Sequence, residues 1–383
     1  MSLASARLLH RHALVAAALV VACDQPPRSP ARQPEGILAF SAKVASPSPA
    51  GGDWLVAGDW DRDGYPDLAT GTSTGVLSVL RNNGRALFAP VGTYALRGSP
   101  VALAAGDLDG DGDADLALAQ PGQDAVALFA GRGDGSFSGP DQVAAGLAPS
   151  CLVAADFDGD RRAELAVGAT ASSEIILLSV GRGAQRYPVA APVALASADL
   201  NGDGRLDLVV GGEPRAGVVI EVLLGARDGS FSRGARYELA ASRLASLAAA
   251  DLNGDRWPDL VVATGPVGIE LLFGKGDGTF RRGGRVQTSE RLSGLRQVVL
   301  ADLNGGGRAD LAVVLAPDGA TAQLSVLVNR GGGGFAPAVV VGELNTVGVG
   351  RTCLAAADLD GDGRLDLVSS EGQQVAAFLN QSR

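Results

Sequence analysis

Residues 107–116 read DLDGDGDADL, which places five aspartates in ten positions between the apolar runs VALAA and LALA. Carboxylates this close repel one another unless a cation lies among them. Calcium takes about six to eight oxygen ligands, and a short loop supplies them when alternate side chains converge on one point. In the pattern DxDxDGxxD, positions 1, 3, 5 and 9 offer carboxylates and position 7 offers its backbone carbonyl. The glycine at position 6 permits the left-handed backbone that curls the loop, so the stretch predicts a calcium site.

The same pattern occurs seven times. The copies begin at Asp59, Asp107, Asp156, Asp199, Asp251, Asp302 and Asp358, with separations of 48, 49, 43, 52, 51 and 56 residues. This spacing is typical of a four-stranded propeller blade and not of a helical repeat. Short runs rich in valine, leucine and alanine, bounded by glycine, asparagine and aspartate, predict four strands in each unit and no helices. We name these strands A to D in chain order; the aspartate loop joins A to B.

The two ends of the repeat region indicate a closed ring. A glycine-rich turn ending in an aromatic residue, such as GRGDGSF, precedes strand D in each of the first six units, but the last unit has no strand D. Residues 37–47 form an orphan strand whose Phe40 lies 48 positions before Phe88 and therefore matches strand D in phase. Pairing of this strand with the last unit would cover an exposed sheet edge. We therefore predict an all-β, seven-bladed β-propeller over residues 37–383, closed by its N-terminal strand.

The aspartate loop and the GDGSF turn together resemble the FG-GAP or VCBS repeat of integrin alpha-subunit propellers and of many exported bacterial proteins. The resemblance covers nearly all of residues 37–383 and implies a calcium-binding propeller. In integrin-like propellers, the face opposite the calcium loops binds ligands. On that face the connections between strands D and A carry more basic than acidic residues, which favours an anionic protein or glycan. The candidate ligand-binding residues are Arg97, Arg243, Arg291, Arg296 and Arg351.

Six of the seven loops are predicted to bind calcium. The ligands, with position 7 acting through its backbone carbonyl, are Asp59, Asp61, Asp63, Tyr65 and Asp67; Asp107, Asp109, Asp111, Asp113 and Asp115; Asp156, Asp158, Asp160, Arg162 and Glu164; Asp199, Asn201, Asp203, Arg205 and Asp207; Asp251, Asn253, Asp255, Trp257 and Asp259; Asp358, Asp360, Asp362, Arg364 and Asp366. Arg161 and Arg256 replace the glycine of position 6. The copy at Asp302 keeps only two carboxylates, so we expect it to be weak or empty. The alternative is that these aspartates only hydrogen-bond their own turns.

The N-terminus predicts export. Two arginines precede an apolar run over residues 13–22, which is too short to cross a bilayer and is typical of a secretory signal. Residues 20–23, VVAC, resemble the bacterial lipobox. We expect residues 1–22 to be removed and Cys23 to carry a lipid. The proline-rich residues 23–36 would then tether the propeller to the outer membrane or the cell surface; an ordinary signal with a chance cysteine is the alternative.

Charge and residue types restrict the function. The formal net charge of −10 argues against nucleic acid as a partner. The two histidines, His10 and His12, both lie in the predicted signal, so the mature chain has no Ser/His/Asp or Cys/His arrangement. We therefore expect a binding or adhesion protein, monomeric and not an enzyme. Two alternatives remain: a lectin that holds glycans between blades, and a polysaccharide-processing enzyme.

Overall fold

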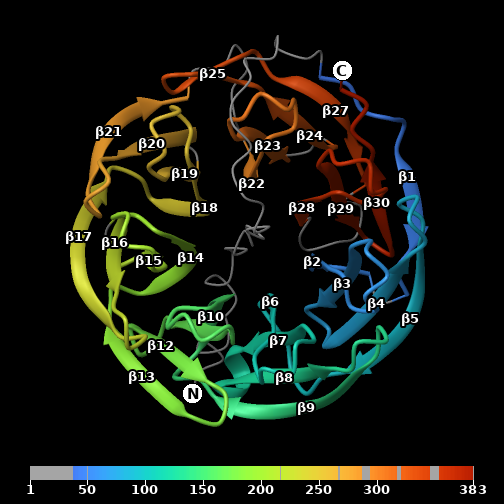
Figure 1. Cartoon of the computed structure of the whole chain (residues 1–383), viewed down its shortest axis with the longest axis horizontal. Helices are drawn as coiled ribbons and strands as arrows, with labels where there is room; N and C mark the ends of the chain where they lie inside the picture. Colours follow the sequence, from blue (N-terminus) through green and yellow to red (C-terminus); the bar gives the residue numbers. More distant parts are fainter. Residues whose placement is uncertain are drawn as a thin grey trace, which may run out of the picture.

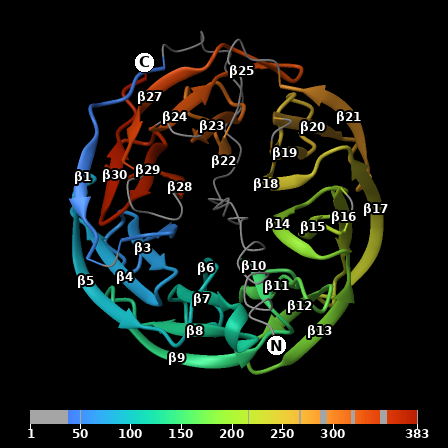
Figure 2. The ribbon, with the colours of Figure 1, turned by 180° about the vertical axis from the view of Figure 1, so that it is seen from behind.

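The computed structural model describes residues 38–49, 51–215, 217–265, 268–286, 294–316, 321–345 and 353–382. These residues form seven four-stranded antiparallel sheets arranged around a common axis, with strand A of each blade nearest the axis and strand D at the rim (Figure 1). The view from behind shows the same closed ring (Figure 2). The helical content of the described residues is one short 3-10 turn, η1 (Pro121–Gln123). The prediction of an all-β, seven-bladed propeller is confirmed.

Each of the first six blades is continuous in sequence. Blade 1 comprises β2 (Trp54–Gly58), β3 (Asp67–Thr72), β4 (Val76–Asn82) and β5 (Phe88–Ala95); blade 2 comprises β6 (Ala102–Gly106), β7 (Asp115–Gln120), β8 (Ala125–Gly131) and β9 (Phe137–Ala144); blade 3 comprises β10 (Pro149–Ala155), β11 (Glu164–Ala169), β12 (Glu174–Ser179) and β13 (Gly183–Pro188). Blade 4 comprises β14 (Pro192–Ala198), β15 (Asp207–Gly212), β16 (Val218–Gly225) and β17 (Phe231–Leu239); blade 5 comprises β18 (Arg243–Ala250), β19 (Asp259–Gly265), β20 (Gly268–Gly274) and β21 (Phe280–Arg285). Blade 6 comprises β22 (Leu295–Ala301), β23 (Asp310–Leu315), β24 (Ala322–Leu327) and β27 (Val339–Leu344), with a small hairpin of β25 (Asn329–Gly331) and β26 (Gly334–Phe335).

The seventh blade combines both ends of the described chain. Its strand order is β1-β30-β29-β28, in which β28 (Leu354–Ala357), β29 (Asp366–Glu371) and β30 (Gln374–Phe378) are joined by β1 (Val44–Pro47). Strand β1 is shorter than the predicted 37–47, although Phe40 still forms an isolated bridge with Asn380. This bridge is equivalent to the pairing of Phe88 with Asn82 in blade 1.

Burial follows the position of each strand in the blade. Every residue of β3, β7, β11, β15, β23 and β29, the B strands of six blades, is buried. These strands are sandwiched between the two neighbouring blades, which explains why their sequences are continuous apolar runs instead of alternating patterns. The rim strands are largely exposed and alternate, as in β5 and β9. Cys151 lies on strand A of blade 3 and Cys353 directly precedes β28; both side chains are buried, and burial raises the pKa of the Cys151 thiol to about 12.

Side chains of the rim strands connect neighbouring blades. The Tyr94 hydroxyl accepts the backbone N–H of Phe137 in the next blade at 2.9 Å, and the two rings meet edge to face. The pairs Tyr187–Phe231 and Tyr237–Phe280 repeat this contact at 2.9 and 2.6 Å. At the junction between blades 7 and 1, the Ser46 hydroxyl takes the same role toward Phe88 at 3.0 Å. The aromatic residue that ends each of these glycine-rich turns thus marks a blade-to-blade contact.

An ion pair holds the N-terminal segment onto the ring. The Lys43 ammonium lies 2.8 Å from the carboxylate of Glu371, whose side chain is fully buried, while the Lys43 side chain is 31% exposed. The same ammonium donates to the backbone carbonyl of Glu343 in blade 6 at 3.2 Å. Glu371 also accepts hydrogen bonds from Asn345 N–H and the Ser369 hydroxyl. The segment therefore contacts three consecutive blades, 6, 7 and 1.

We expect Lys43→Met to lower the free energy of unfolding by about 2 kcal/mol, because it leaves the buried Glu371 carboxylate without its counter-charge. Urea unfolding at pH 7.5 measures the change. The double variant Lys43→Met/Glu371→Gln removes the unpaired charge and should recover part of the loss. A single variant as stable as the wild type would show that this ion pair does not hold the segment.

Candidate metal centres

The seven aspartate loops occupy equivalent places at one end of the blades. Each loop follows strand A, and its position 9 is the first residue of strand B in every blade. Position 6 has a positive φ throughout, for example 91° at Gly64 and 88° at Gly112. Arg161 and Arg256 adopt the same conformation at 73° and 76°, so the loop shape persists where the glycine is lost, at the energetic cost of a left-handed non-glycine residue.

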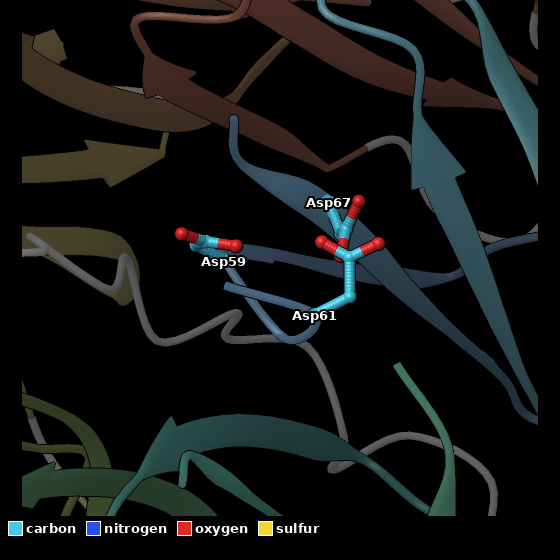
Figure 3. A group of neighbouring side chains, drawn as sticks. All are labelled: Asp59, Asp61 and Asp67. Carbon is cyan, nitrogen blue, oxygen red and sulfur yellow. The ribbon is translucent and has the colours of Figure 1, made fainter. Parts of the chain in front are cut away.

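Three carboxylates converge in four of the loops. Ligand atoms from positions 1, 3 and 9 lie within 4.8 Å of one another in the groups Asp59, Asp61, Asp67; Asp107, Asp109, Asp115; Asp156, Asp158, Glu164; and Asp358, Asp360, Asp366. Figure 3 shows the first group, in which Asp59, Asp61 and Asp67 come from the loop and from the start of β3. All the donors are carboxylate oxygens, the ligand type that calcium prefers and soft metals do not. The residues therefore fit calcium.

The carboxylate at position 1 shapes the loop. In all seven loops it accepts the backbone N–H of position 6, at 2.8–3.0 Å. This bond folds the loop back on itself before any ion is considered. The aspartate at position 1 can therefore hydrogen-bond its own turn and also serve as a calcium ligand, so the two interpretations of the sequence pattern are compatible.

The carboxylate at position 9 is buried and links the ends of three strands by hydrogen bonds. One oxygen accepts the N–H of position 2 in every loop, at 2.8–3.3 Å. In every blade except blade 3, the other oxygen accepts an N–H at or within two residues of the end of strand C, at 2.7–2.8 Å. Burial raises the pKa of Asp67, Asp115, Asp259 and Asp310 to about 6, that of Asp366 to about 7, and also the pKa of Asp207 and Glu164.

Position 5 lies outside the three-carboxylate groups. Its side chain accepts the N–H of position 7 at 2.8–3.0 Å in six loops. In two loops it also pairs with an arginine of the same loop, Asp203 with Arg205 and Asp362 with Arg364. The structure thus brings together three of the four predicted side-chain ligands and directs the fourth toward its own turn.

Position 7 has a role that the sequence pattern did not reveal. Tyr65 packs between Gly84 of its own blade and Gly361 of loop 7, and a Cβ added at either glycine would lie under 3.0 Å from the ring. Trp257 packs in the same way between Gly276 and Gly202 of loop 4. The predicted carbonyl ligand therefore belongs to a residue whose side chain fills the seam between adjacent loops. A large aromatic at position 7, facing glycine at position 4 of the preceding copy, was the available signal.

Loops 4, 5 and 6 have fewer carboxylates. Position 3 is Asn201 in loop 4 and Asn253 in loop 5, and both amides hydrogen-bond the carboxylate of position 5, at 3.4 and 2.8 Å. Loop 6 has the same curled backbone with Asn304 and Gly306 at positions 3 and 5. The loop fold therefore does not require the full ligand set, and loop 6 retains the structure with two of the four side-chain carboxylates.

The predicted ligand-binding arginines lie at the other end of the blades. Arg97 is exposed in the connection between β5 and β6, Arg296 is exposed on β22, and Arg243 begins β18 and is half-buried. The antiparallel order of the strands places these residues on the face opposite the aspartate loops. Arg291 and Arg351 lie outside the described residues, as do Cys23 and the predicted signal.

Sequence comparison decides the family. A family model for the FG-GAP-like repeat matches residues 59–118, 107–167, 199–262, 251–313 and 302–369. The chain belongs to the FG-GAP-like repeat family. The matched FG-GAP-like segments begin at five of the aspartate loops identified above, and each overlaps the next except between residues 167 and 199. No curated protein matches the chain significantly.

Solved structures share the FG-GAP-like propeller's fold at low identity. The BBS1N chain in a crystal structure with ARL6DN superposes with a TM-score of 0.61 and 13% identity, covering 90% of this chain and 97% of that chain. An Agrocybe aegerita lectin that recognises non-reducing terminal N-acetylglucosamine superposes with a TM-score of 0.55 and 17% identity, covering 82% and 88%. Within the described residues of the FG-GAP-like chain, no helix has the length and hydropathy needed to cross a membrane.

The buried carboxylates predict an unusual pH dependence in EGTA. Their pKa values of about 6 to 7 exceed the ordinary value of 3.8, so the folded state binds protons more tightly than the unfolded state. The stabilisation by these protons is complete below about pH 3.8 and is lost as the pH rises through 6 to 7. We expect the free energy of unfolding in EGTA to fall by at least about 1 kcal/mol between pH 5 and pH 7.5.

Urea unfolding at the two pH values tests this expectation. With saturating calcium the decline should vanish or reverse, because the ion binds the deprotonated carboxylates. Stability in EGTA that rises over this range would contradict the assignment.

Proposed function

We propose that this FG-GAP-like propeller is a calcium-stabilised binding module, exported and held at the cell envelope by a lipid on Cys23. The observation that carries the calcium proposal is the convergence of three carboxylate oxygens in four equivalent loops. Each group includes a buried position 9 whose pKa is raised, so its charge lacks compensation. A divalent ion would neutralise that charge.

The loop residues determine what calcium binding would accomplish. Positions 1 and 3 belong to the segment after strand A, whereas position 9 belongs to strand B, so a shared ion cross-links the two. The ion binds the folded state and not the unfolded one, and at ten times its dissociation constant each site adds about 1.4 kcal/mol by mass action. Sites of this kind in extracellular modules are weak, with dissociation constants of about 10⁻⁴–10⁻³ M. Calcium is thus proposed to stabilise the ring and not to take part in catalysis.

Calcium removal should destabilise the propeller. We expect the melting temperature to fall by several degrees when EGTA replaces about 5 mM calcium, consistent with about 1 kcal/mol or more per lost site. Asp109→Asn removes one ligand of loop 2 and should reduce this shift, whereas Asn304→Ala in loop 6 should leave it unchanged. Identical melting curves with calcium and with EGTA would refute the calcium proposal.

Binding is favoured over catalysis by the chemistry of the chain. No histidine follows His12, and the carboxylates at positions 1 and 9 of loops 1 and 2 already accept backbone N–H groups that hold the loop together. One structural neighbour is described in complex with a protein, ARL6DN, and another recognises N-acetylglucosamine. We propose a protein or glycan ligand carrying negative charge, bound on the face that bears Arg97, Arg243 and Arg296.

A lectin is the second candidate. The observation that favours it is Trp257, a large aromatic residue that is half-buried at the seam between blades 4 and 5. Aromatic rings stack on sugar rings. A site at Trp257 would lie on the aspartate-loop face, opposite the arginines, so the two candidates are separable by mutation.

Two measurements test the anchor and the ligand. Membrane fractionation of the producing cells should find the wild type with the envelope and Cys23→Ser in the soluble fraction; equal distributions would refute the anchor. On an array of acidic and neutral glycans, Arg97→Ser/Arg296→Ser should weaken binding to acidic glycans at least tenfold, whereas Arg85→Ser, on the opposite face, should not. Binding that depends on Trp257 and not on the arginines would support the lectin instead.

A further inference from the structure

The third aspartate loop already holds a cation of the protein itself. Arg182, in the turn between β12 and β13, contacts the carboxylates of both Asp158 and Asp160, with the Asp158 contact at 3.5 Å. These residues are positions 3 and 5 of loop 3, two of its predicted metal ligands. Elsewhere in the described parts of the chain, no arginine pairs with two carboxylates of one aspartate loop.

The shape of the turn explains why Arg182 reaches its own loop. In blades 2, 4 and 5 the turn is held by an aspartate that accepts the N–H and hydroxyl of the residue two positions later: Asp134 with Ser136, Asp228 with Ser230, and Asp277 with Thr279. Two of these turns extend to the preceding blade, where Gly135 N–H donates to the Trp60 carbonyl at 2.9 Å and Gly278 N–H to the Leu200 carbonyl at 3.1 Å.

Blade 3 lacks this aspartate and has a tighter turn. Ala184 stands where blade 2 has Asp134, counting back from the aromatic residues Tyr187 and Phe137. Strand pairing continues to Ser179 and Gly183, and Arg182 N–H donates to the Ser179 carbonyl at 3.0 Å. The tip of the turn therefore stays above loop 3 and places the guanidinium on that loop's carboxylates.

The rest of loop 3 departs from the calcium pattern in the same blade. Glu164 replaces aspartate at position 9 and accepts one backbone N–H, from Phe157, instead of two. Arg161 replaces the glycine at position 6. The three-carboxylate group of Asp156, Asp158 and Glu164 is nevertheless intact, so loop 3 keeps the ligand group of loop 2 and differs from it in these two substitutions and in the arginine that contacts two of its carboxylates.

We infer that Arg182 takes the place of calcium at loop 3, so that a guanidinium and not an ion neutralises this loop. The inference rests on the proposal that the other intact loops bind calcium, and it reduces the expected number of sites from six to five. A calcium ion at loop 3 would meet a positive charge already paired with Asp158, one of the three converging ligands, and with Asp160 beside it. Like charges at this distance repel, so calcium binding requires Arg182 to leave.

Counting bound calcium tests the inference. The mature chain from Cys23 onward is stripped with EDTA and dialysed against about 10 mM calcium, well above the weak dissociation constants expected. Asp109→Asn in loop 2 should lose one equivalent, whereas Asp158→Asn in loop 3 should lose none. Arg182→Ser should gain one equivalent, Arg182→Lys should gain none, and Arg186→Ser, which breaks an ion pair with Glu174 in the same blade, should also gain none.

Stability provides a second measurement that does not depend on counting. Arg182→Ser should melt below the wild type in EGTA and recover most of the difference in calcium, because the ion replaces the lost guanidinium. The inference is overturned if Asp158→Asn loses an equivalent as Asp109→Asn does, or if Arg182→Ser gains none. If no variant binds calcium, the proposed function fails and the inference fails with it, which is a different result from the loss of one equivalent in both loops.

Discussion

The architecture depends on one hydrogen-bonded carboxylate repeated around the ring. The acidic residue at position 9 is buried at the start of strand B and accepts the N–H of position 2, just after strand A. In six blades its second oxygen accepts an N–H at or within two residues of the end of strand C. One side chain thus fixes the ends of three strands, and no apolar residue could replace it without leaving buried N–H groups unpaired. In these blades both oxygens accept backbone N–H groups. The residue therefore has a structural role without a metal, and a metal ion bound here would coordinate an oxygen that already accepts a hydrogen bond.

The sequence alone was sufficient to predict the features that recur in every blade. Seven aspartate copies at blade-sized spacing predict the strand order, and the phase of Phe40 relative to Phe88 predicts where the orphan strand belongs. The metal groups were predictable in part for the same reason, since positions 1, 3 and 9 converge within a short loop. The direction of position 5 was not predictable, because a carboxylate in a tight turn can face either a central ion or its own backbone, and the pattern is the same for both.

The repeated sequence pattern did not predict the contacts between neighbouring blades. Asn82, Asn329 and Asn380 each donate to a carbonyl of their own loop and to a carbonyl of the preceding blade's loop, at 2.6–3.0 Å. These three asparagines occupy consecutive junctions of the ring, those between blades 5 and 6, 6 and 7, and 7 and 1. Two other junctions use a glycine N–H for the same purpose, and at the junction between blades 2 and 3 Ala163 N–H donates to the Asp107 carbonyl. The turn in blade 3 likewise places Arg182 against loop 3, a contact that its neighbours in sequence do not predict.

The composite seventh blade has a consequence for biosynthesis. Strand β1 is among the first parts of the propeller to leave the ribosome, yet the strand with which it pairs, β30, is among the last. Until that partner is made, Val44–Pro47 must remain without its hydrogen bonds while six blades assemble beside it. The ring therefore cannot close before β30 is made, and the sheet edge that β30 then offers can be occupied by β1 of a second molecule instead, which makes domain exchange through β1 the characteristic misassembly of this architecture.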